Sequence, residues 1–237
     1  MENASYTTLT RQSGLMREMQ VVANNIANSA TAGFRQEGVI FSEYVKRVEG
    51  APSLSMATAN IHNTSLNQGT LTQTGGQFDF AIEGDGFFLI ETPAGERLTR
   101  AGSFSPNGQG ELVTNDGFRV LDGGSAPIFI PPDAVDLSVS SDGTVSSNGR
   151  PLAQIGLFLP IDPLDLRRED GVMFRADSGI EPTESSAILQ GYLEGSNVDP
   201  ISQIARMIEV QRAYEMGQSF LDSENERIRN ALKTFVK

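Results

Sequence analysis

The sequence has no cysteine, no tryptophan and a single histidine, His62. The absence of cysteine excludes disulfides, cysteine-based metal sites and thiol nucleophiles. One histidine excludes a multi-histidine metal site. Gly84-Asp85-Gly86 lacks the third glycine and the following helix of a dinucleotide-binding loop, and no phosphate-binding loop is present. We therefore expect no catalytic residues, no cofactor and no metal, and a protein that is not an enzyme.

Long hydrophobic runs are also missing. No stretch of about 18 apolar residues occurs, so we expect a protein that does not span a membrane. The first residues, Met-Glu-Asn-Ala-Ser, show neither the basic region nor the apolar region of a secretion signal, so we expect no cleaved signal peptide.

Basic charge is scarce in the middle of the chain. The net charge is −12, and all of this excess falls in residues 42–196, because residues 1–41 and 197–237 each carry equal numbers of acids and bases. An acidic middle without a basic patch argues against a nucleic acid partner. The balanced ends suit surfaces that pack side by side.

The last forty residues contain the longest regular pattern in the chain. Steps of three and four residues predict a helix of roughly 50 Å over about 200–235, with Asp199-Pro200 as its start. This seam consists of Met207, Val210, Tyr214, Gly217, Leu221, Glu224, Ile228, Ala231 and Phe235. The helix could lie on the core of its own domain, or it could bind partners from this chain and from others.

A second helix is predicted over residues 3–30. One apolar stripe contains Leu15, Met19, Val22 and Ile26, and a second stripe contains Leu9, Met16 and Ala23. A helix that is apolar on more than one side is usually buried between neighbours. Asn28 and Gly33 mark its end, and we expect Gly33 to adopt a positive φ.

Between the helices the pattern changes to short strands and turns. We expect an extended connector over residues 35–77 and a β-rich outer domain over 78–196, where hairpin signals such as Asn115-Asp116-Gly117 and Asn148-Gly149 recur. The fold class is therefore α+β. Residues 1–34 and 197–237 form a coiled-coil-type helical domain, and a mainly antiparallel all-β domain is inserted between them.

Four separated motifs resemble those of the bacterial flagellar rod and hook proteins, and the resemblance covers essentially the whole chain. They are Asn24-Asn25-Ile26-Ala27-Asn28 with Thr31, Gly33 and Phe34; Gly84-Asp85-Gly86-Phe87-Phe88; Thr99-Arg100-Ala101-Gly102-Ser103-Phe104; and Leu193 to Asp199 with Met207 to Glu215. Within the family the chain looks most similar to proximal-rod subunits, with distal-rod subunits as the alternative.

The resemblance implies a structural, torque-transmitting subunit of the flagellar basal body. Such subunits are exported unfolded by the flagellar type III export apparatus, without a cleaved signal, and assemble in the periplasm with copies of themselves and with other proximal and distal rod proteins. Their terminal helices form an inner coiled-coil layer and their β domain an outer layer. The other classes that we weigh are a secreted β-rich binding module, a hydrolytic enzyme and a cytoplasmic coiled-coil scaffold.

Two groups of residues are expected to carry this function. The subunit interface is predicted to contain Leu9, Leu15, Met19, Val22, Ile26, Ile204, Met207, Ile208, Val210, Tyr214, Leu221 and Ile228. The turn that leaves the first helix is predicted to depend on Asn24, Asn25, Asn28, Gly33 and Phe34.

Overall fold

The computed structural model describes residues 2–46, 54–183 and 185–235. The chain divides into two compact units, which we treat separately. The helical unit comprises Met1–Ala27, Glu37–Asn63 and Asp199–Lys237, and the β unit comprises Asn28–Gln36 and Thr64–Val198. We expected the helical domain to include residues 28–34 and 197–198, which the structure instead assigns to the β unit.

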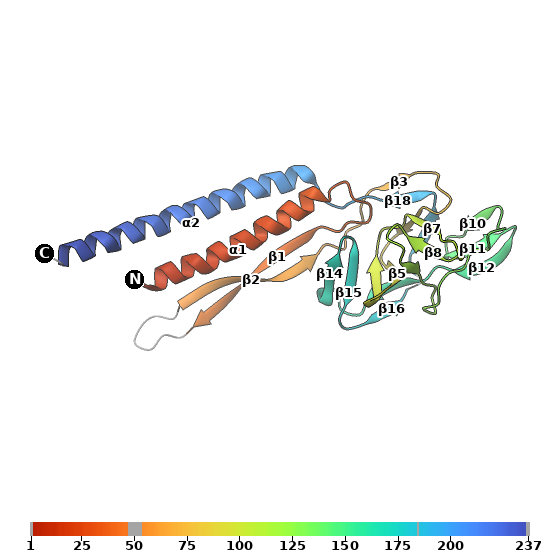
Figure 1. The fold of residues 1–237 in the computed structure, drawn as a ribbon, viewed down its shortest axis with the longest axis horizontal. Helices are drawn as coiled ribbons and strands as arrows, with labels where there is room; N and C mark the ends of the chain where they lie inside the picture. The colour runs from red at the N-terminus through yellow and green to blue at the C-terminus, as the bar shows by residue number, and fades with distance from the viewer. Residues whose placement is uncertain (1, 47–53, 184, 236–237) are drawn as a thin grey trace. The chain divides into compact units, whose positions relative to one another are not determined.

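Two antiparallel helices form most of the helical unit. α1 spans Glu2–Ala27 and α2 spans Pro200–Phe235, so both helices predicted from the ends of the chain are present. They lie side by side, and the beginning of α1 and the end of α2 are at the same end of the pair (Figure 1). The lengths of 26 and 36 residues correspond to about 39 and 54 Å, so the last residues of α2 extend beyond α1.

The residues of the predicted seam lie on the less exposed face of α2 over most of the length of the helix. Met207, Tyr214, Gly217, Leu221 and Glu224 are half-buried and Val210 is buried, whereas Ile228 and Ala231 are exposed. The seam loses its partner after Glu224 because α1 is the shorter helix. The side chain of Phe235 lies outside the described residues.

The two stripes of α1 have different environments. Leu15 and Val22 are buried and Met19 and Ile26 are half-buried, as expected for a face packed against α2. The second stripe is exposed in the single chain at Leu9, Met16 and Ala23, so its burial between neighbouring chains stays a prediction for the assembled protein. The other buried positions of α1 are instead Gln12, Gly14, Glu18, Val21 and Asn25.

The expected connector over 35–77 contains regular structure. β1 (Glu37–Lys46) and β2 (Leu54–Thr64) pair with each other, and β1 packs against α1. Residues 47–53, which belong to the same expected connector, lie outside the described residues. The sequence of β2, LSMATANIHNT, lacks a sustained alternation of apolar and polar residues. Hydrophobic periodicity therefore does not predict this strand, which pairs through backbone hydrogen bonds.

The β unit has short strands in four sheets, and every pairing recorded for it is antiparallel. This confirms the predicted mainly antiparallel domain between two helices. Among the described residues the largest sheet has nine strands, with a main path of β14-β15-β6-β5-β9-β8-β7, with β13 paired to β5 and with β16 paired to β13. The remaining sheets are β10-β11-β12, β4-β17 and β3-β18.

The strands of the β unit are β3 (Leu71–Gln73), β4 (Phe80–Glu83), β5 (Phe87–Thr92), β6 (Gly95–Thr99), β7 (Phe104–Pro106), β8 (Leu112–Thr114), β9 (Arg119–Val120), β10 (Leu137–Val139), β11 (Thr144–Ser147), β12 (Arg150–Gln154), β13 (Leu157–Pro160), β14 (Leu166–Asp170), β15 (Met173–Ala176), β16 (Ile180–Pro182), β17 (Ala187–Gln190) and β18 (Tyr192–Glu194). A short 3-10 helix, η1 (Pro163–Asp165), precedes β14. Two predicted turns are observed at Asn115–Gly117, between β8 and β9, and at Asn148-Gly149, between β11 and β12.

The core of the β unit is organised around β5. Phe88 and Ile90 belong to one cluster of buried apolar residues, and Phe87 and Leu89 belong to a second. Because successive side chains of a strand point to opposite faces, the continuous apolar run of β5 is buried on both sides. This strand also lies between the Gly84-Asp85-Gly86 segment and the Thr99-Arg100 segment, which together help to form the site described next.

Candidate functional site

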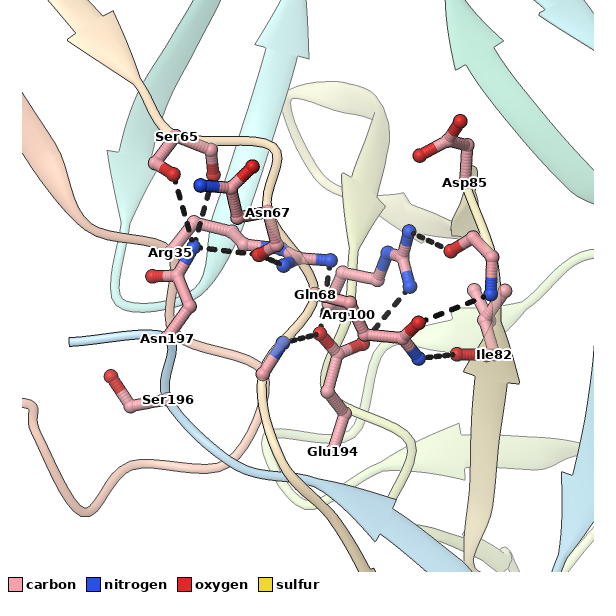
Figure 2. Close-up of polar contacts among 12 residues, drawn as sticks. Arg35, Ser65, Asn67, Gln68, Ile82, Asp85, Arg100, Glu194, Ser196 and Asn197 are labelled. Atoms are coloured by element: carbon pink, nitrogen blue, oxygen red, sulfur yellow. Dashed lines mark hydrogen bonds and ion pairs between the residues drawn. The ribbon is translucent and has the colours of Figure 1, made fainter.

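Residues from three of the four sequence motifs, and Arg35 directly after the remaining one, meet at one place in the β unit. Figure 2 shows Arg35 from the segment after α1, Asp85 from the turn before β5, Arg100 directly after β6, and Glu194 from β18. These residues are far apart in the sequence. Their convergence explains why the separated motifs occur in one chain.

The carboxylate of Glu194 lies at the centre of this site. Its Oε1 is 3.0 Å from Arg35 Nη2 and accepts a hydrogen bond from the Gly69 amide at 2.8 Å. Its Oε2 accepts a hydrogen bond from Arg100 Nη1 at 2.9 Å. The side chains of Arg35, Arg100 and Glu194 are 1%, 2% and 1% exposed, and we call them the buried ionic cluster.

The buried ionic cluster holds two cations and one anion. Burial, and secondly the charge of Arg100, lowers the pKa of Arg35 to about 10, although Glu194 and Asp85 act in the opposite direction. Burial also lowers the pKa of Arg100, again against the attraction of Glu194. Desolvation therefore outweighs the ion pairs. Removing one member of such a buried pair strands the remaining charges, so the cluster favours one arrangement of its three segments.

Backbone carbonyls accept further hydrogen bonds from both arginines. Arg100 Nη2 donates to Gly84 O at 2.8 Å, and Arg35 Nη1 donates to Asn67 O. Gln68 links the same region to β4, because its Nε2 donates to Ile82 O at 2.6 Å and its Oε1 accepts from the Gly84 amide at 3.3 Å (Figure 2). The Gly84-Asp85 turn is thus held against the cluster.

The segment that follows α1 is hydrogen-bonded to the segment that precedes α2. The Gly33 amide donates to Glu194 O at 2.8 Å, and the Asn197 amide donates to Phe34 O at 3.3 Å. Asn197 Oδ1 accepts from the Gln36 amide at 2.6 Å, and its Nδ2 donates to Asn67 O at 2.7 Å. The β unit therefore fixes the two ends of the chain that continue into α1 and α2 next to each other.

Gly33 and Phe34 occupy demanding positions in this arrangement. Gly33 has a φ of 72°, which confirms the predicted positive φ, and a Cβ there would lie 2.3 Å from the Ala101 amide nitrogen. Only glycine fits both the backbone conformation and the close approach. Phe34 is buried, and the Arg168 guanidinium lies 4.1 Å from the centre of its ring.

Asparagines at the end of α1 form hydrogen bonds in both units. In the helical unit, Asn25 is 1% exposed and joins three elements. Its Nδ2 donates to Glu37 O of β1 at 2.7 Å and to Gln203 Oε1 of α2 at 3.1 Å, and its Oδ1 accepts from the Glu37 amide at 3.0 Å.

The other two asparagines of the predicted turn are less buried than Asn25. In the β unit, the Thr31 amide donates to Asn28 O at 3.1 Å, and Thr31 Oγ1 lies 3.1 Å from Asn28 Oδ1. Asn24 is exposed. The contacts of Asn25 described above join separate elements of the helical unit.

The predicted interface residues fall into two groups. Eight are buried or half-buried within the helical unit: Leu15, Met19, Val22, Ile26, Met207, Val210, Tyr214 and Leu221. Four are exposed: Leu9, Ile204, Ile208 and Ile228. The residues of the first group pack within the helical unit of one chain, and those of the second group are accessible to another molecule.

Arg35, Arg100 and Glu194 were not among the predicted site residues, although all three lie within or directly beside the motifs. The available signal was the charge itself, since Arg35 follows a buried-type aromatic residue and Arg100 and Glu194 are flanked by small or apolar residues. Sequence spacing does not show which charges pair across the fold.

Neither a metal centre nor a membrane-spanning segment is found in the part of the chain that the structure describes. Within residues 2–46, 54–183 and 185–235, no three histidine, cysteine or acidic side chains are grouped as metal ligands. Neither described helix combines the length and hydropathy needed to cross a bilayer.

Comparison with known proteins gives matches along the whole chain. The family model described as "Flagellar hook protein FlgE/F/G D1 domain" matches residues 81–147, and "Flagellar basal body rod FlgEFG protein C-terminal" matches residues 189–234. The chain is 37% identical to flagellar basal-body rod protein FlgF of Caulobacter vibrioides, over 100% of this chain and 99% of the relative.

Two further relatives show the same pattern. The chain is 37% identical to FlgF of Mesorhizobium japonicum, over 99% of this chain and 98% of the relative. It is 33% identical to flagellar basal-body rod protein FlgG of Bacillus subtilis, over 95% of this chain and 96% of the relative. The resemblance inferred from the four motifs is thereby confirmed.

Proposed function

The chain belongs to the FlgE/F/G family of flagellar hook and basal-body rod proteins, and on this premise we propose that it is a structural subunit of the proximal part of the flagellar rod. It assembles with copies of itself and with other rod subunits, and it transmits motor torque along the axis. Similarity to FlgF proteins over the full length of the chain supports the proximal position.

One structural observation carries the proposal. The charge-balanced terminal helices keep apolar side chains exposed even after they have packed against each other, among them Leu9, Met16, Ile204 and Ile208. Burial of apolar area is worth about 25 cal/mol per Å², so these side chains favour association with further helices. A subunit that serves alone would have no use for them.

The buried ionic cluster fits the same role. Torque passes through a rod only if each subunit keeps its shape, and the cluster fixes the segments that continue into α1 and α2 within the β unit. In this proposal the terminal helices form an inner layer with coiled-coil packing, the β unit faces outward, and the protein has no catalytic role.

Delivery is proposed from family membership. The unfolded chain leaves the cytoplasm through the flagellar type III export apparatus, without removal of a signal peptide, and folds in the periplasm as it joins the rod. The partners are then this export apparatus and the neighbouring rod subunits.

The alternative function is a distal-rod subunit, which the 33% identity to FlgG over 95% of the chain supports. A secreted β-rich binding module is disfavoured, because such a module would not need the exposed apolar side chains of α1 and α2.

The test is deletion of the gene in the motile bacterium that encodes it, followed by electron microscopy of purified basal bodies. A rod that stops before its distal segment, with loss of motility that the full chain restores, is the expected result. A proximal stub that lacks only the long distal segment would favour the distal-rod alternative. Intact, rotating flagella would overturn both rod assignments.

A further inference from the structure

A groove opens between α1 and α2 of the helical unit. It has a volume of about 300 Å³, and its apolar wall is formed by Leu15 together with Ala213, Met216 and Phe220. For scale, an apolar cavity of about 150 Å³ accommodates a benzene molecule. The groove therefore has room for about two aliphatic side chains.

Gln12 lies in this groove with an unused acceptor. Its side chain is buried (7% exposed), and its Nε2 donates to Tyr214 O at 2.8 Å. Gly217 permits this approach, since a Cβ there would be 2.3 Å from Gln12 Nε2. Among the described residues no donor reaches Gln12 Oε1. A buried acceptor without a donor is unfavourable because it has lost its water partners, so the groove favours a ligand that brings a donor.

Arg11 adds a charge at the same groove. It is exposed, and within the described part of the chain no acceptor or carboxylate is recorded for its guanidinium. A complementary ligand therefore offers two aliphatic groups, a hydrogen-bond donor for Gln12 and an acceptor for Arg11.

The end of α2 presents such a set. We call residues 225–235 the overhang, because they follow the last half-buried position of α2, Glu224. Asn225, Ile228 and Leu232 follow one another at steps of three and four, so they share one face of the helix. All three are exposed. The amide of Asn225 supplies both a donor and an acceptor, and Ile228 and Leu232 supply two aliphatic groups.

We propose that the overhang of α2 from a second copy of this chain occupies the groove, with Asn225 at Gln12 and Arg11, Ile228 beside Met216, and Leu232 beside Phe220. This inference rests on the proposed function and names the contact through which copies associate. All three pairings are consistent with one register. Ile228 and Leu232 each lie twelve residues after their partner position on α2, as Asn225 does after Ala213, which corresponds to an axial offset of about 18 Å.

The occupant is a second copy because one chain carries both complementary surfaces. They are different faces of α2, about 120° apart for a separation of twelve residues at 100° per residue, so the contact is head-to-tail. A head-to-tail contact leaves a groove open on one copy and an overhang free on the other, and repetition generates a helical array. The area is small compared with a stable interface, so we expect the contact in the assembled rod and not in dilute solution.

Cysteine cross-linking tests the contact, since the natural chain has no cysteine. Two double variants place a pair across the proposed contact: Met216→Cys with Ile228→Cys, and Phe220→Cys with Leu232→Cys. The control double variant is Ile201→Cys with Leu232→Cys, in which residue 201 is exposed but lies outside the groove. Each full-length variant replaces the natural protein, and purified basal bodies are oxidised and separated without reductant.

The expected result is a disulfide-linked dimer of this chain for both groove pairs and none for the control or for the single variants, because a disulfide requires Cα atoms within about 7 Å. Motile strains whose groove pairs give no dimer would overturn this inference and leave the proposed function intact. A cross-link to a different rod protein, identified by mass spectrometry, would overturn the second copy as the occupant. The proposed function is tested separately by the deletion strain, and it fails if that strain builds complete rods or lacks only the long distal segment.

Discussion

Arg35 and Glu194 form an ion pair of 3.0 Å in which both side chains are 1% exposed, although they come from opposite ends of the β unit's sequence. Arg100 contacts the other oxygen of the same carboxylate. Three of the four family motifs thus share one buried carboxylate, and the Gly84-Asp85 turn joins them through a backbone carbonyl. The motifs have a common structural reason, which is to hold the incoming and outgoing segments on the β unit.

The first prediction concerns this carboxylate. Glu194→Gln leaves two buried guanidinium groups without a counter-charge, and we expect it to destabilise the β unit by about 3–5 kcal/mol. The free energy of unfolding is measured by denaturant titration. Hydrogen exchange of peptides from β4 to β6 then measures the stability of this part of the β unit. The matched control is Glu91→Gln, which removes a half-exposed partner of Arg119 and should change stability by less than about 0.5 kcal/mol.

A double-mutant cycle separates the ionic contribution from simple packing loss. Adding Arg35→Met to Glu194→Gln removes one of the stranded charges, so the double variant should be less destabilised than the sum of the two single variants. Additive losses would show that the two residues do not interact in solution.

The second prediction compares two glycines with nearly the same backbone. Gly33 and Gly75 have φ values of 72° and 71°, but a Cβ at Gly33 would meet the Ala101 backbone whereas a Cβ at Gly75 meets nothing within 4 Å. Gly75→Ala should cost about 1–2 kcal/mol for the left-handed conformation. Gly33→Ala should cost about 1–3 kcal/mol more because of overpacking. Thermal unfolding of both variants provides the comparison, and equal losses would contradict the close approach.

The third prediction concerns Asn25 in the helical unit. Asn25→Asp keeps an acceptor for the Glu37 amide but removes the donor to Glu37 O and Gln203 Oε1. A carboxylate oxygen then faces these two acceptor oxygens without a hydrogen between them. Each unsatisfied buried group costs about 1–3 kcal/mol. Amide exchange near the end of α1, in β1 and at the start of α2 should therefore accelerate. Gln20→Glu makes the same amide-to-carboxylate change at an exposed position of α1, so it serves as the control and should leave these rates unchanged.

The fourth prediction separates assembly from folding. Ile204→Glu combined with Ile208→Glu charges two exposed apolar positions of α2, so the isolated chain should keep its thermal midpoint and helical circular dichroism. Swimming in soft agar should be lost, because two carboxylates would be carried into an interface between helices. Gln218→Glu adds charge at another exposed position of α2 and should leave swimming intact. Normal swimming of the double variant would show that Ile204 and Ile208 do not lie in the interface.

Local sequence patterns were sufficient to predict the helices, the turns and one backbone conformation. The steps of three and four predicted α1 and α2, since a helix repeats every 3.6 residues whatever it packs against. Asn148-Gly149 and Asn115-Asp116-Gly117 predicted turns, and Gly33 predicted a positive φ, because these depend on the backbone freedom of single residues. The four motifs carried the resemblance to the family.

Features that depend on residues far apart in the sequence became visible only in the folded chain. No local pattern indicates that Arg35 and Arg100 share Glu194, because ion pairing depends on three-dimensional proximity and not on spacing. Hydrophobic period could not reveal β1 and β2 in the expected connector, since their pairing uses the backbone. It also could not distinguish the buried Leu15 from the exposed Leu9, because both have apolar side chains and only the position of α2 determines which one is covered.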